Sequence, residues 1–334
     1  MIALSARMLA DLAGRDVVAF DLFGDLDLRA SRVVTAGGLT ALVDAALAEP
    51  PGTVVYGASF ENHPKLVARL AERHTAAGNP PETLRAVRDP QQLAAVLRDV
   101  PAISFTTTVD RSRRWLRKPL RGGGGTRVRD WRGGALAAGT YLQERIEGSP
   151  CSAAAIANGE DAVVLGLTEQ LVGRRAFGVR GYRWCGNVTL EHEGLKAQAS
   201  EICSQVARAF GLRGLFGVDF IWDGERAWTL EVNPRPTASL ELFGDGDTLA
   251  AHLRGELSEP RPPRATGKAV LFATEDITIG DSERWLEVGV RDVPHPGEKI
   301  AAGRPICTLF TTAPEPVAAL EEQAARLLEV PAHA

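Results

Sequence analysis

The sequence has few of the residues that build disulfides, structural zinc sites or nucleic-acid surfaces. Its four cysteines (Cys151, Cys185, Cys203 and Cys307) form no CxxC pair, and its six histidines form no HxH or HExxH spacing. We therefore expect reduced thiols and no structural zinc. The formal net charge is −4, and because a phosphate backbone is bound by an excess of basic residues, we expect no nucleic-acid partner.

Long hydrophobic runs are also absent. No segment reaches about 18 uninterrupted apolar residues, the length of a membrane-spanning helix, and the N-terminus lacks the pattern of a signal peptide. The 334 residues are 45% hydrophobic and 24% charged, as in soluble globular proteins. We therefore expect a cytoplasmic protein of two or three domains with no membrane partner. The sequence leaves both a monomer and a homodimer open.

The first 100 residues alternate between strand-like and helix-like patterns. Runs rich in β-branched residues at 16–21 (DVVAFD) and 52–57 (GTVVYG) predict strands, and the apolar spacing in 39–49 and 63–77 predicts helices. Alternation of this kind predicts a small parallel sheet.

An acidic loop, DLFGDLDLRAS, follows the first of these strands and holds Asp21, Asp25 and Asp27. One interpretation is a solvated loop at the edge of the sheet. The other is a wall of a substrate site, with Asp21 as the candidate substrate residue.

The pattern changes after residue 112. Residues 112–170 contain β-like segments joined by turns with glycine and asparagine, which predicts a mostly antiparallel unit. Residues 194–210 have the apolar spacing of a helix that ends at Gly211. Two strands should follow, at 215–222 and 226–233, and then a helix-compatible stretch at 238–255. A proline-rich connector at 258–267 leads to a β-rich cap at 267–312, and a terminal helix follows the cap.

The second of the paired strands runs into EVNPRPTAS, residues 231–239, where core-type residues are scarce. Alternate side chains of a strand share a face, so Thr229, Glu231 and Asn233 should point one way while Leu230 and Val232 point into the core. Glu231 and Asn233 are therefore expected to be neighbours.

Asp219 is the odd polar residue on its face of the partner strand. A strict two-residue turn at Asp223 and Gly224 would put Asp219 and Glu231 on opposite faces, whereas an odd-length loop or a bulge would bring them together. Two carboxylates and an amide oxygen on one face suit Mg²⁺ beside nucleotide phosphates. The alternative is that both acids pair with arginines on a solvated face.

A glycine-rich stretch, LRKPLRGGGGTRV (116–128), places Lys118 just before four consecutive glycines. Glycines expose backbone amides and allow an anion to approach closely, and lysine adds a positive charge. The stretch predicts a phosphate-binding loop without the Walker spacing. The alternative is a flexible hairpin turn.

Together these stretches resemble the ATP-grasp superfamily of ligases. Lys118 with its glycines, the segment LQERIEG (142–148), and then Asp219, Glu231 and Asn233 occur in the family's order, and EVNPR is close to a family signature. The resemblance covers nearly the whole chain and implies an α/β (α+β) ATP-grasp fold. It also implies four parts, an N-terminal α/β domain, a central lid subdomain, a metal- and substrate-binding subdomain and a β-rich cap, at 1–100, 101–170, 171–260 and 261–334.

The resemblance implies ATP as a cofactor and assigns residues to it. Lys118 would bind the phosphates, under a mobile lid made of Gly122, Gly123, Gly124 and Gly125. The 142–148 hinge would meet adenine through the backbone of Glu144 and Ile146, and adenine or ribose through its other members, Gln143, Arg145 and Glu147.

The resemblance also implies Mg²⁺, with Mn²⁺ as the alternative, held by Asp219, Glu231 and Asn233. Arg235 would be catalytic together with Lys118, because a fixed cation there stabilises the charge of an acyl phosphate. The family commonly has a second phosphate-binding lysine some forty residues before the first. Arg88 stands near that place, either as its replacement or as a surface charge.

The implied chemistry joins a small-molecule carboxylate to an amine, both of them amino acids. The γ-phosphoryl group activates the carboxylate, and the amine then attacks the acyl phosphate. The loop 173–187 offers arginines for substrate carboxylates, although each is equally well explained as a solvated charge: Arg174, Arg175, Arg180 and Arg183.

The sequence as a whole resembles an ATP-grasp branch linked to methanopterin- and methanofuran-type one-carbon cofactors. That branch is similar to tyramine–glutamate ligases, and a counterpart would join glutamate to tyrosine in methylofuran biosynthesis. Two alternatives stay open: an enzyme like biotin carboxylase that uses bicarbonate, and an ATP-binding regulatory module without catalysis.

Overall fold

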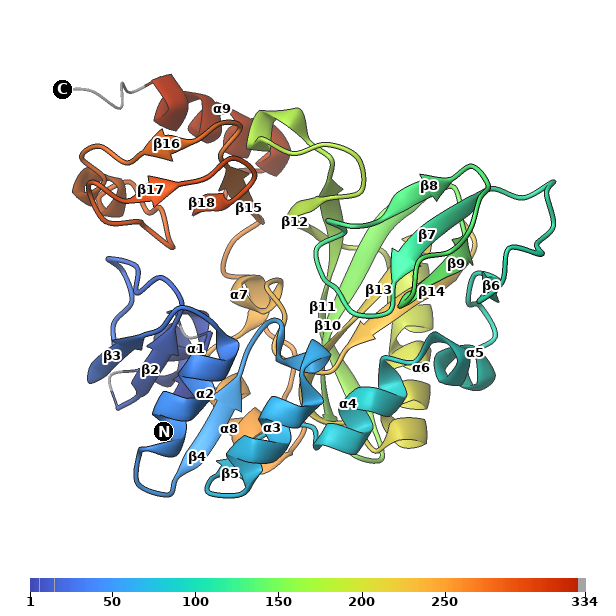
Figure 1. Ribbon diagram of the computed structural model, residues 1–334, viewed down its shortest axis with the longest axis horizontal. Coiled ribbons are helices and arrows are strands. Elements are labelled where there is room, and N and C mark those ends of the chain that lie inside the picture. Colours follow the sequence, from blue (N-terminus) through green and yellow to red (C-terminus); the bar gives the residue numbers. More distant parts are fainter. Residues whose placement is uncertain (6, 15, 330–334) are drawn as a thin grey trace.

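The computed structural model describes residues 1–5, 7–14 and 16–329. The chain forms an N-terminal α/β domain, a large antiparallel sheet, a small sheet beside it and a C-terminal cap (Figure 1). Within the described residues, no helix is long and apolar enough to cross a bilayer. The four cysteines are buried free thiols, as expected.

The N-terminal domain is a five-stranded parallel sheet, which confirms the predicted sheet. Its strands lie in the order β3-β2-β1-β4-β5, with bounds Arg32–Thr35, Val18–Asp21, Ile2–Leu4, Thr53–Tyr56 and Thr75–Ala76. Its helices are α1 (Arg7–Ala13), α2 (Leu39–Leu47), α3 (Pro64–Ala71), α4 (Pro81–Val87) and α5 (Pro90–Val96), with a 3₁₀ turn, η1, at Phe60–Asn62. The helix predicted over 63–77 ends at Ala71, because Thr75 and Ala76 pair with β4 instead.

The large sheet has the order β14-β13-β10-β11-β12-β15-β18. The bounds are Ala227–Asn233, Arg213–Trp222, Ser149–Asn158, Ala162–Val172, Trp184–Leu190, Gly267–Phe272 and Pro305–Thr311. One face is covered by α6 (Glu193–Phe210), whose Leu195, Cys203 and Val206 lie in the same core as β10 and β13. The other face packs against α7 (Leu240–Phe243) and α8 (Gly246–Arg254).

The small sheet has the order β6-β9-β7-β8 and forms a separate layer over the β13–β14 end of the large sheet (Figure 1). Its strands are Ile103–Ser104, Thr140–Glu144, Trp115–Pro119 and Arg129–Trp131. The antiparallel pairing predicted for 112–170 is thus confirmed. The boundary expected after residue 170 falls within β11, which pairs with β12, so that division remains a prediction.

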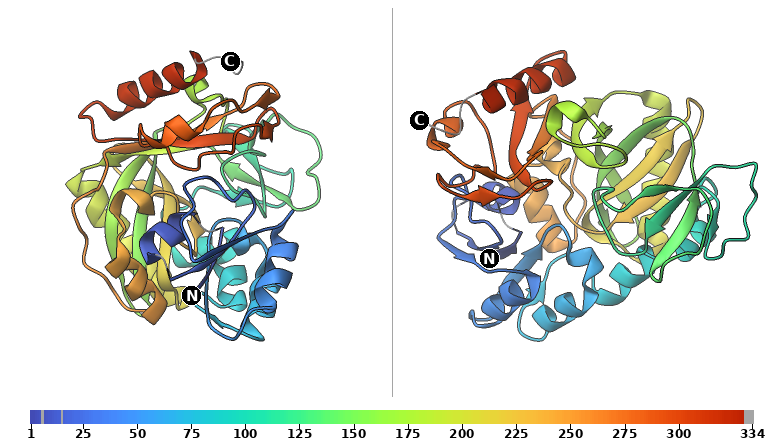
Figure 2. Two further views of the ribbon diagram at one scale, coloured as in Figure 1. Left: turned by 90° about the vertical axis from the view of Figure 1, so that its left-hand side faces the viewer. Right: turned by 45° about the horizontal axis from the view of Figure 1, so that its top comes forward.

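The cap lies over the N-terminal domain and extends the large sheet through β15 and β18 (Figure 2). It adds a short pair, β16 (Ile277–Thr278) with β17 (Lys299–Ile300), the 3₁₀ turn η3 (Glu283–Leu286) and the terminal helix α9 (Pro316–Glu329). The helix-compatible stretch 238–255 is split into α7 and α8 at Gly244.

A buried ion network holds the N-terminal domain to the cap. Arg7, 6% exposed, donates through Nε to Asp292 Oδ1 at 2.5 Å and also pairs with Glu241. Lys268 pairs with the same Glu241. Asp27 accepts a hydrogen bond from the Val293 amide at 2.9 Å. Since these groups are paired and largely removed from water, the network fixes how the two parts dock.

Candidate functional site

A β-bulge puts two carboxylates opposite each other on the last two strands of the large sheet. Phe220 pairs with Thr229, the register shifts by one residue, and Asp219 then pairs with Glu231. The connection between the strands has four residues, 223–226, so the bulge alone brings the acids onto one face. This is the second arrangement that the sequence left open.

The same bulge corrects one expectation. Thr229 was expected on the face of Glu231, but it pairs with Phe220, whose side chain lies in the core beneath α6. Its side chain is fully buried, and its Oγ1 has no hydrogen-bond partner within the described structure. The extra residue in β14 reverses the alternation of side chains between positions 229 and 231.

Asp219 lies at the centre of a polar cluster. Its Oδ2 accepts from Asn233 Nδ2 at 3.0 Å, and its Oδ1 accepts from Gln170 Nε2 at 2.8 Å. Burial and the nearby charge of Glu231 raise the pKa of Asp219 to about 7. Two adjacent carboxylates that are only partly exposed to water cannot both ionise at low cost, so the pair favours an added cation.

Three cations surround these acids. Burial opposes ionisation of Glu231, but the charges of Arg88, Lys118 and Arg235 outweigh it and hold the pKa of Glu231 below its usual value. Arg88 Nη1 lies 3.4 Å from Glu231 Oε2. The cluster therefore combines two acids, an amide oxygen and three fixed positive charges.

Lys118 enters the cluster from β7 in the small sheet. It is 9% exposed, and its Nζ donates to Gln143 Oε1 at 2.9 Å. Gln143 in turn donates to the Leu230 carbonyl at 3.4 Å, next to the bulge. Gln143 thus links the small sheet, Lys118 and the bulged strand.

The remaining hinge side chains lie farther toward the surface. Glu144 accepts from Arg113 at 2.7 Å, and the exposed Glu147 pairs with Arg114 at 3.0 Å. Arg145 lies 3.3 Å from Glu147. Residues 145–148 connect β9 to β10 and so join the two sheets, as a hinge requires. The roles of Glu144, Arg145, Ile146 and Glu147 toward a nucleotide stay predictions.

The four glycines lie between β7 and β8, and hydrogen bonds fasten them to other elements. The Gly122 amide donates to Asn62 Oδ1 at 3.0 Å, and the Gly124 carbonyl accepts from the Trp184 amide at 3.1 Å. Gly125 has φ +66°, and a Cβ there would lie 1.8 Å from the Tyr182 carbonyl oxygen. Position 125 therefore requires glycine for the loop to dock on 182–184.

Arg235 is held from the N-terminal domain. Its Nη2 donates to Glu61 Oε1 at 2.8 Å, and the Glu61 side chain is 1% exposed. Burial works against the charge, but Glu61 outweighs it and raises the pKa of Arg235. Three buried atoms near the acids lack partners within the described structure: Glu61 Oε2, Arg88 Nε and Arg235 Nε. Unpaired buried polar atoms in one cluster are typical of a site that receives a ligand.

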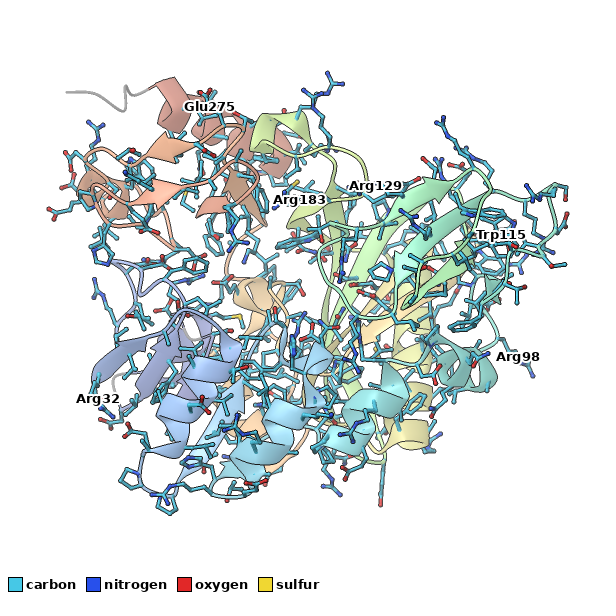
Figure 3. All side chains as sticks on the ribbon, in the orientation of Figure 1. Arg32, Arg98, Trp115, Arg129, Arg183 and Glu275 are labelled. Carbon is cyan, nitrogen blue, oxygen red and sulfur yellow. The ribbon has the colours of Figure 1, made fainter. Side chains whose placement is uncertain are left out.

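The arginines of the 173–187 loop are not gathered at this cluster. Arg174, Arg175 and Arg180 are exposed. Arg183 donates to the Gly303 carbonyl and stacks on Phe272, both in the cap, and Figure 3 shows it between the cap and the small sheet. A role for these arginines in substrate binding stays a prediction.

The acidic loop that follows Asp21 contacts the cap through part of its length. Asp21 is buried and accepts from the Phe23 amide at 2.9 Å. The Leu26 amide donates to the Val293 carbonyl. Burial and the charge of Asp292 raise the pKa of Asp25 to about 8. The loop therefore lies at the contact between the N-terminal domain and the cap. The role of Asp21 as a substrate residue stays a prediction.

The donor set suits a hard divalent cation. Among the described residues no three His, Cys, Asp or Glu side chains gather to form a metal site on their own. The oxygens on the bulge are two carboxylates and one amide, which is the incomplete set that Mg²⁺ uses when phosphate oxygens complete its shell.

Three residues of the cluster were not predicted from the sequence: Glu61, Asn62 and Gln170. Glu61 and Asn62 follow the carboxyl end of β4, next to β1, where the order of the parallel strands reverses. Ligand sites in open α/β sheets occur at that place. The position of Glu61 and Asn62 in the sequence could therefore have identified them as site residues. Gln170 lies beside Asp219 only through strand register, which the sequence did not give.

A family model described as an ATP-grasp domain matches residues 89–239. The range includes Lys118, Asp219, Glu231, Asn233 and Arg235 and begins just after Arg88. An uncharacterized protein of Methanocaldococcus jannaschii is 28% identical over 131 residues, 38% of this chain and 33% of the relative. The matched part thus spans about a third of that protein's length.

Two solved structures share the fold over nearly the whole chain. An L-amino acid ligase from Bacillus licheniformis superposes with a TM-score of 0.65 at 14% identity, covering 97% of this chain and 96% of the other. The biotin carboxylase domain of 2-oxoglutarate carboxylase from Hydrogenobacter thermophilus, with MgADP and bicarbonate, gives 0.69 at 14% identity, covering 94% and 86%. The match over 89–239, a little less than half of the chain, agrees with the geometry of the cluster, and these superpositions show that the chain has the ATP-grasp fold.

Proposed function

We propose that this protein is an ATP-dependent, ADP-forming ligase that joins a carboxylate to an amine through an acyl phosphate. The observation that carries the proposal is the bulge cluster, in which Asp219, Glu231 and Asn233 face Lys118 and Arg235 in a largely buried site. Such a set has both the oxygens for a metal–phosphate complex and the cations for the charge that develops during phosphoryl transfer.

Each side chain has a task in this proposal. Asp219, Glu231 and Asn233 hold the divalent cation, which neutralises phosphate charge when bound. Lys118, fixed by Gln143, binds phosphate oxygens beneath the loop of Gly122 to Gly125. The backbone at Glu144 and Ile146 meets the adenine edge.

Arg235 acts on the other side of the reacting phosphoryl group. Glu61 holds its guanidinium in place, so that it faces the substrate carboxylate and then the acyl phosphate. The amine attacks the acyl carbon and phosphate leaves, with no protein nucleophile. Arg88, 3.4 Å from Glu231, is the candidate for the second phosphate-binding cation.

The substrates are proposed as amino acids, with glutamate joined to tyrosine or a related amine in methylofuran-type cofactor biosynthesis. Support comes from the sequence resemblance to that branch, while the L-amino acid ligase shares the fold alone. The biotin carboxylase domain shares the fold equally well, so bicarbonate is the competing electrophile. Cytoplasmic location is proposed on the same sequence grounds.

Trapping the activated acyl group tests the mechanism. The protein is incubated with ATP, Mg²⁺, hydroxylamine and each of a panel of amino acids, and the nucleotide and hydroxamate are measured. We expect ADP, phosphate and hydroxamate in equal amounts with one carboxylate, all lost in Arg235→Ala. Mass spectrometry of pooled amino acids with ATP then identifies the amine.

The other outcomes separate the alternatives. AMP and pyrophosphate would contradict the acyl-phosphate route. ADP formation that requires bicarbonate and yields no hydroxamate would favour the carboxylase, and absence of any turnover with intact ATP binding would favour a regulatory module. Full activity in Glu231→Ala or Asn233→Ala, each with an unchanged fold, would refute the metal site.

A further inference from the structure

Arg88 occupies the oxygens that the proposed metal needs. It follows the last residue of α4, and its side chain is 10% exposed. Nη1 lies 3.3 Å from Asn233 Oδ1 and 3.4 Å from Glu231 Oε2, and it also reaches the Val232 carbonyl at 3.4 Å. Because the Asn233 amide nitrogen donates to Asp219, Oδ1 is the atom left for a cation, and Arg88 covers it.

The other nitrogen of Arg88 reaches the glycine-rich loop. Nη2 donates to the Gly122 carbonyl at 3.0 Å. Asn62 holds the same residue from the other side: its Oδ1 accepts from the Gly122 amide at 3.0 Å, and its Nδ2 shares the Gly122 carbonyl with Arg88 at a longer 3.4 Å. One guanidinium therefore ties the metal-binding strand β14 to the loop over the phosphates, across elements far apart in the sequence.

The guanidinium is held loosely for a buried charge. Strong arginine–carboxylate pairs have N–O distances of about 2.7–2.9 Å, often in two parallel bonds. Arg88 has one contact to Glu231 at 3.4 Å, and its Nε has no partner within the described structure. By contrast, the Arg235–Glu61 pair measures 2.8 Å. Arg88 can therefore leave Glu231 without breaking a strong bond.

We propose that Arg88 is an exchangeable cation that fills the metal site when no metal is bound. This inference rests on the proposed function, because it requires a metal at Glu231 and Asn233. A divalent cation at these oxygens repels the guanidinium at close range. Arg88 then moves away, its hydrogen bond to Gly122 is lost, and its charge becomes available to nucleotide phosphates. Metal binding is thereby coupled to release of the glycine-rich loop.

Manganese binding without nucleotide tests the exchange. Free Mn²⁺ is measured by electron paramagnetic resonance with wild-type protein, Arg88→Met and the control Arg85→Met, which removes a charge from an exposed position of the same helix. We expect Arg88→Met to bind Mn²⁺ about tenfold more tightly, since a competing charge is gone. Arg85→Met should match wild type. Equal or weaker Mn²⁺ binding in Arg88→Met would overturn the inference.

Addition of a non-hydrolysable ATP analogue, AMP-PNP, should reverse the ranking of wild type and Arg88→Met by affinity. Arg88→Met should bind Mn²⁺–AMP-PNP several-fold more weakly than wild type, because the freed charge no longer meets phosphate. An unchanged affinity for the complex would show that Arg88 does not move to the nucleotide, and would overturn that step.

Trypsin cleavage after Arg121 and Arg127, which flank the glycines, reports the loop directly. Mn²⁺ alone should speed cleavage in wild type, whereas Arg88→Met should be cleaved fast without metal. Arg88→Lys keeps the charge but lacks the fork that reaches both Gly122 and Glu231, so it should be cleaved fast while its Mn²⁺ affinity stays near wild type. Slow cleavage in both Arg88→Met and Arg88→Lys would refute the proposal that Arg88 holds the glycine-rich loop in place.

Glu231→Gln separates this inference from the proposed function. If Mn²⁺ binding is the same in Glu231→Gln and wild type, the metal site itself is wrong and the exchange fails with it. If Glu231→Gln loses Mn²⁺ while Arg88→Met does not gain affinity, the metal site stands and only the role of Arg88 is wrong.

Discussion

Arg235 Nη2 donates a hydrogen bond to Glu61 Oε1 at 2.8 Å, and this bond joins the segment that follows β14 to the N-terminal domain. Glu61 lies in η1, just after the carboxyl end of β4. The cation proposed to face the acyl phosphate is thus positioned by a domain outside the range that matches the ATP-grasp model. The reacting site depends on how the two domains dock.

The buried Arg235–Glu61 ion pair should contribute more to the free energy of unfolding than an exposed ion pair does. Glu61→Leu leaves a buried guanidinium unpaired, and we expect it to lower the free energy of unfolding by about 3–5 kcal/mol. The double variant Glu61→Leu with Arg235→Met should recover much of that loss. Urea denaturation of the four proteins in a double-mutant cycle measures the coupling.

The exposed pair Arg254–Glu256, at 2.7 Å, is the matched control. Glu256→Gln should cost no more than about 1 kcal/mol, because solvent screens an exposed pair. Equal losses from Glu61→Leu and Glu256→Gln would show that the buried pair has no special role.

Lys118 should contribute to nucleotide binding and little to the fold. Its Nζ has one side-chain partner, Gln143, so Lys118→Met removes a phosphate-binding charge without opening a cavity. We expect calorimetry to show AMP-PNP binding weakened at least about tenfold, with an unchanged midpoint of urea unfolding. Lys65→Met, at an exposed position on α3, is the control and should bind normally. If Lys118→Met binds AMP-PNP as tightly as wild type does, Lys118 does not contribute to the nucleotide site.

Much of the fold could be predicted because strand and helix periodicity is local. The bulge could be stated only as an alternative: whether β14 gains a residue at 230 depends on how Phe220 packs beneath α6, which is a tertiary effect. The position of Arg88 required knowing that α4 ends beside β14. Glu61 could have been found from the end of β4, whereas the arginines of 173–187 stay a prediction, since arginine-rich loops occur for many reasons.

Gly125→Ala should disturb the loop, and Gly123→Ala should not. A Cβ at 125 would meet the Tyr182 carbonyl oxygen at 1.8 Å, and φ is +66°, whereas a Cβ at 123 has nothing within 4 Å. We therefore expect Gly125→Ala to undock the loop from 182–184, to speed trypsin cleavage at Arg121 and Arg127, and to weaken AMP-PNP several-fold. If both substitutions behave alike, the docked position of the loop has no part in nucleotide binding.

His252 should make the protein less stable in mild acid. Its ring is 2% exposed, and Nδ1 accepts a hydrogen bond from the Leu215 amide at 2.9 Å. Burial lowers the pKa of His252 from 6.5 to about 4. Between these values the unfolded chain takes up a proton that the folded protein does not, so stability falls as the pH decreases from about 6.5 to 4, by about 3 kcal/mol in total.

Asn at 252 keeps an acceptor for the Leu215 amide but does not titrate. Wild type should therefore lose unfolding free energy relative to His252→Asn as the pH falls from 6.5 toward 4. Above about pH 7.5 the difference between the two proteins should be constant. Taking the difference cancels Asp25, whose raised pKa acts in the opposite direction in both proteins. His63→Asn, at an exposed position, should follow the wild-type profile. Parallel profiles for wild type and His252→Asn would mean that the ring is protonated in the folded protein, which its hydrogen bond from the Leu215 amide does not allow.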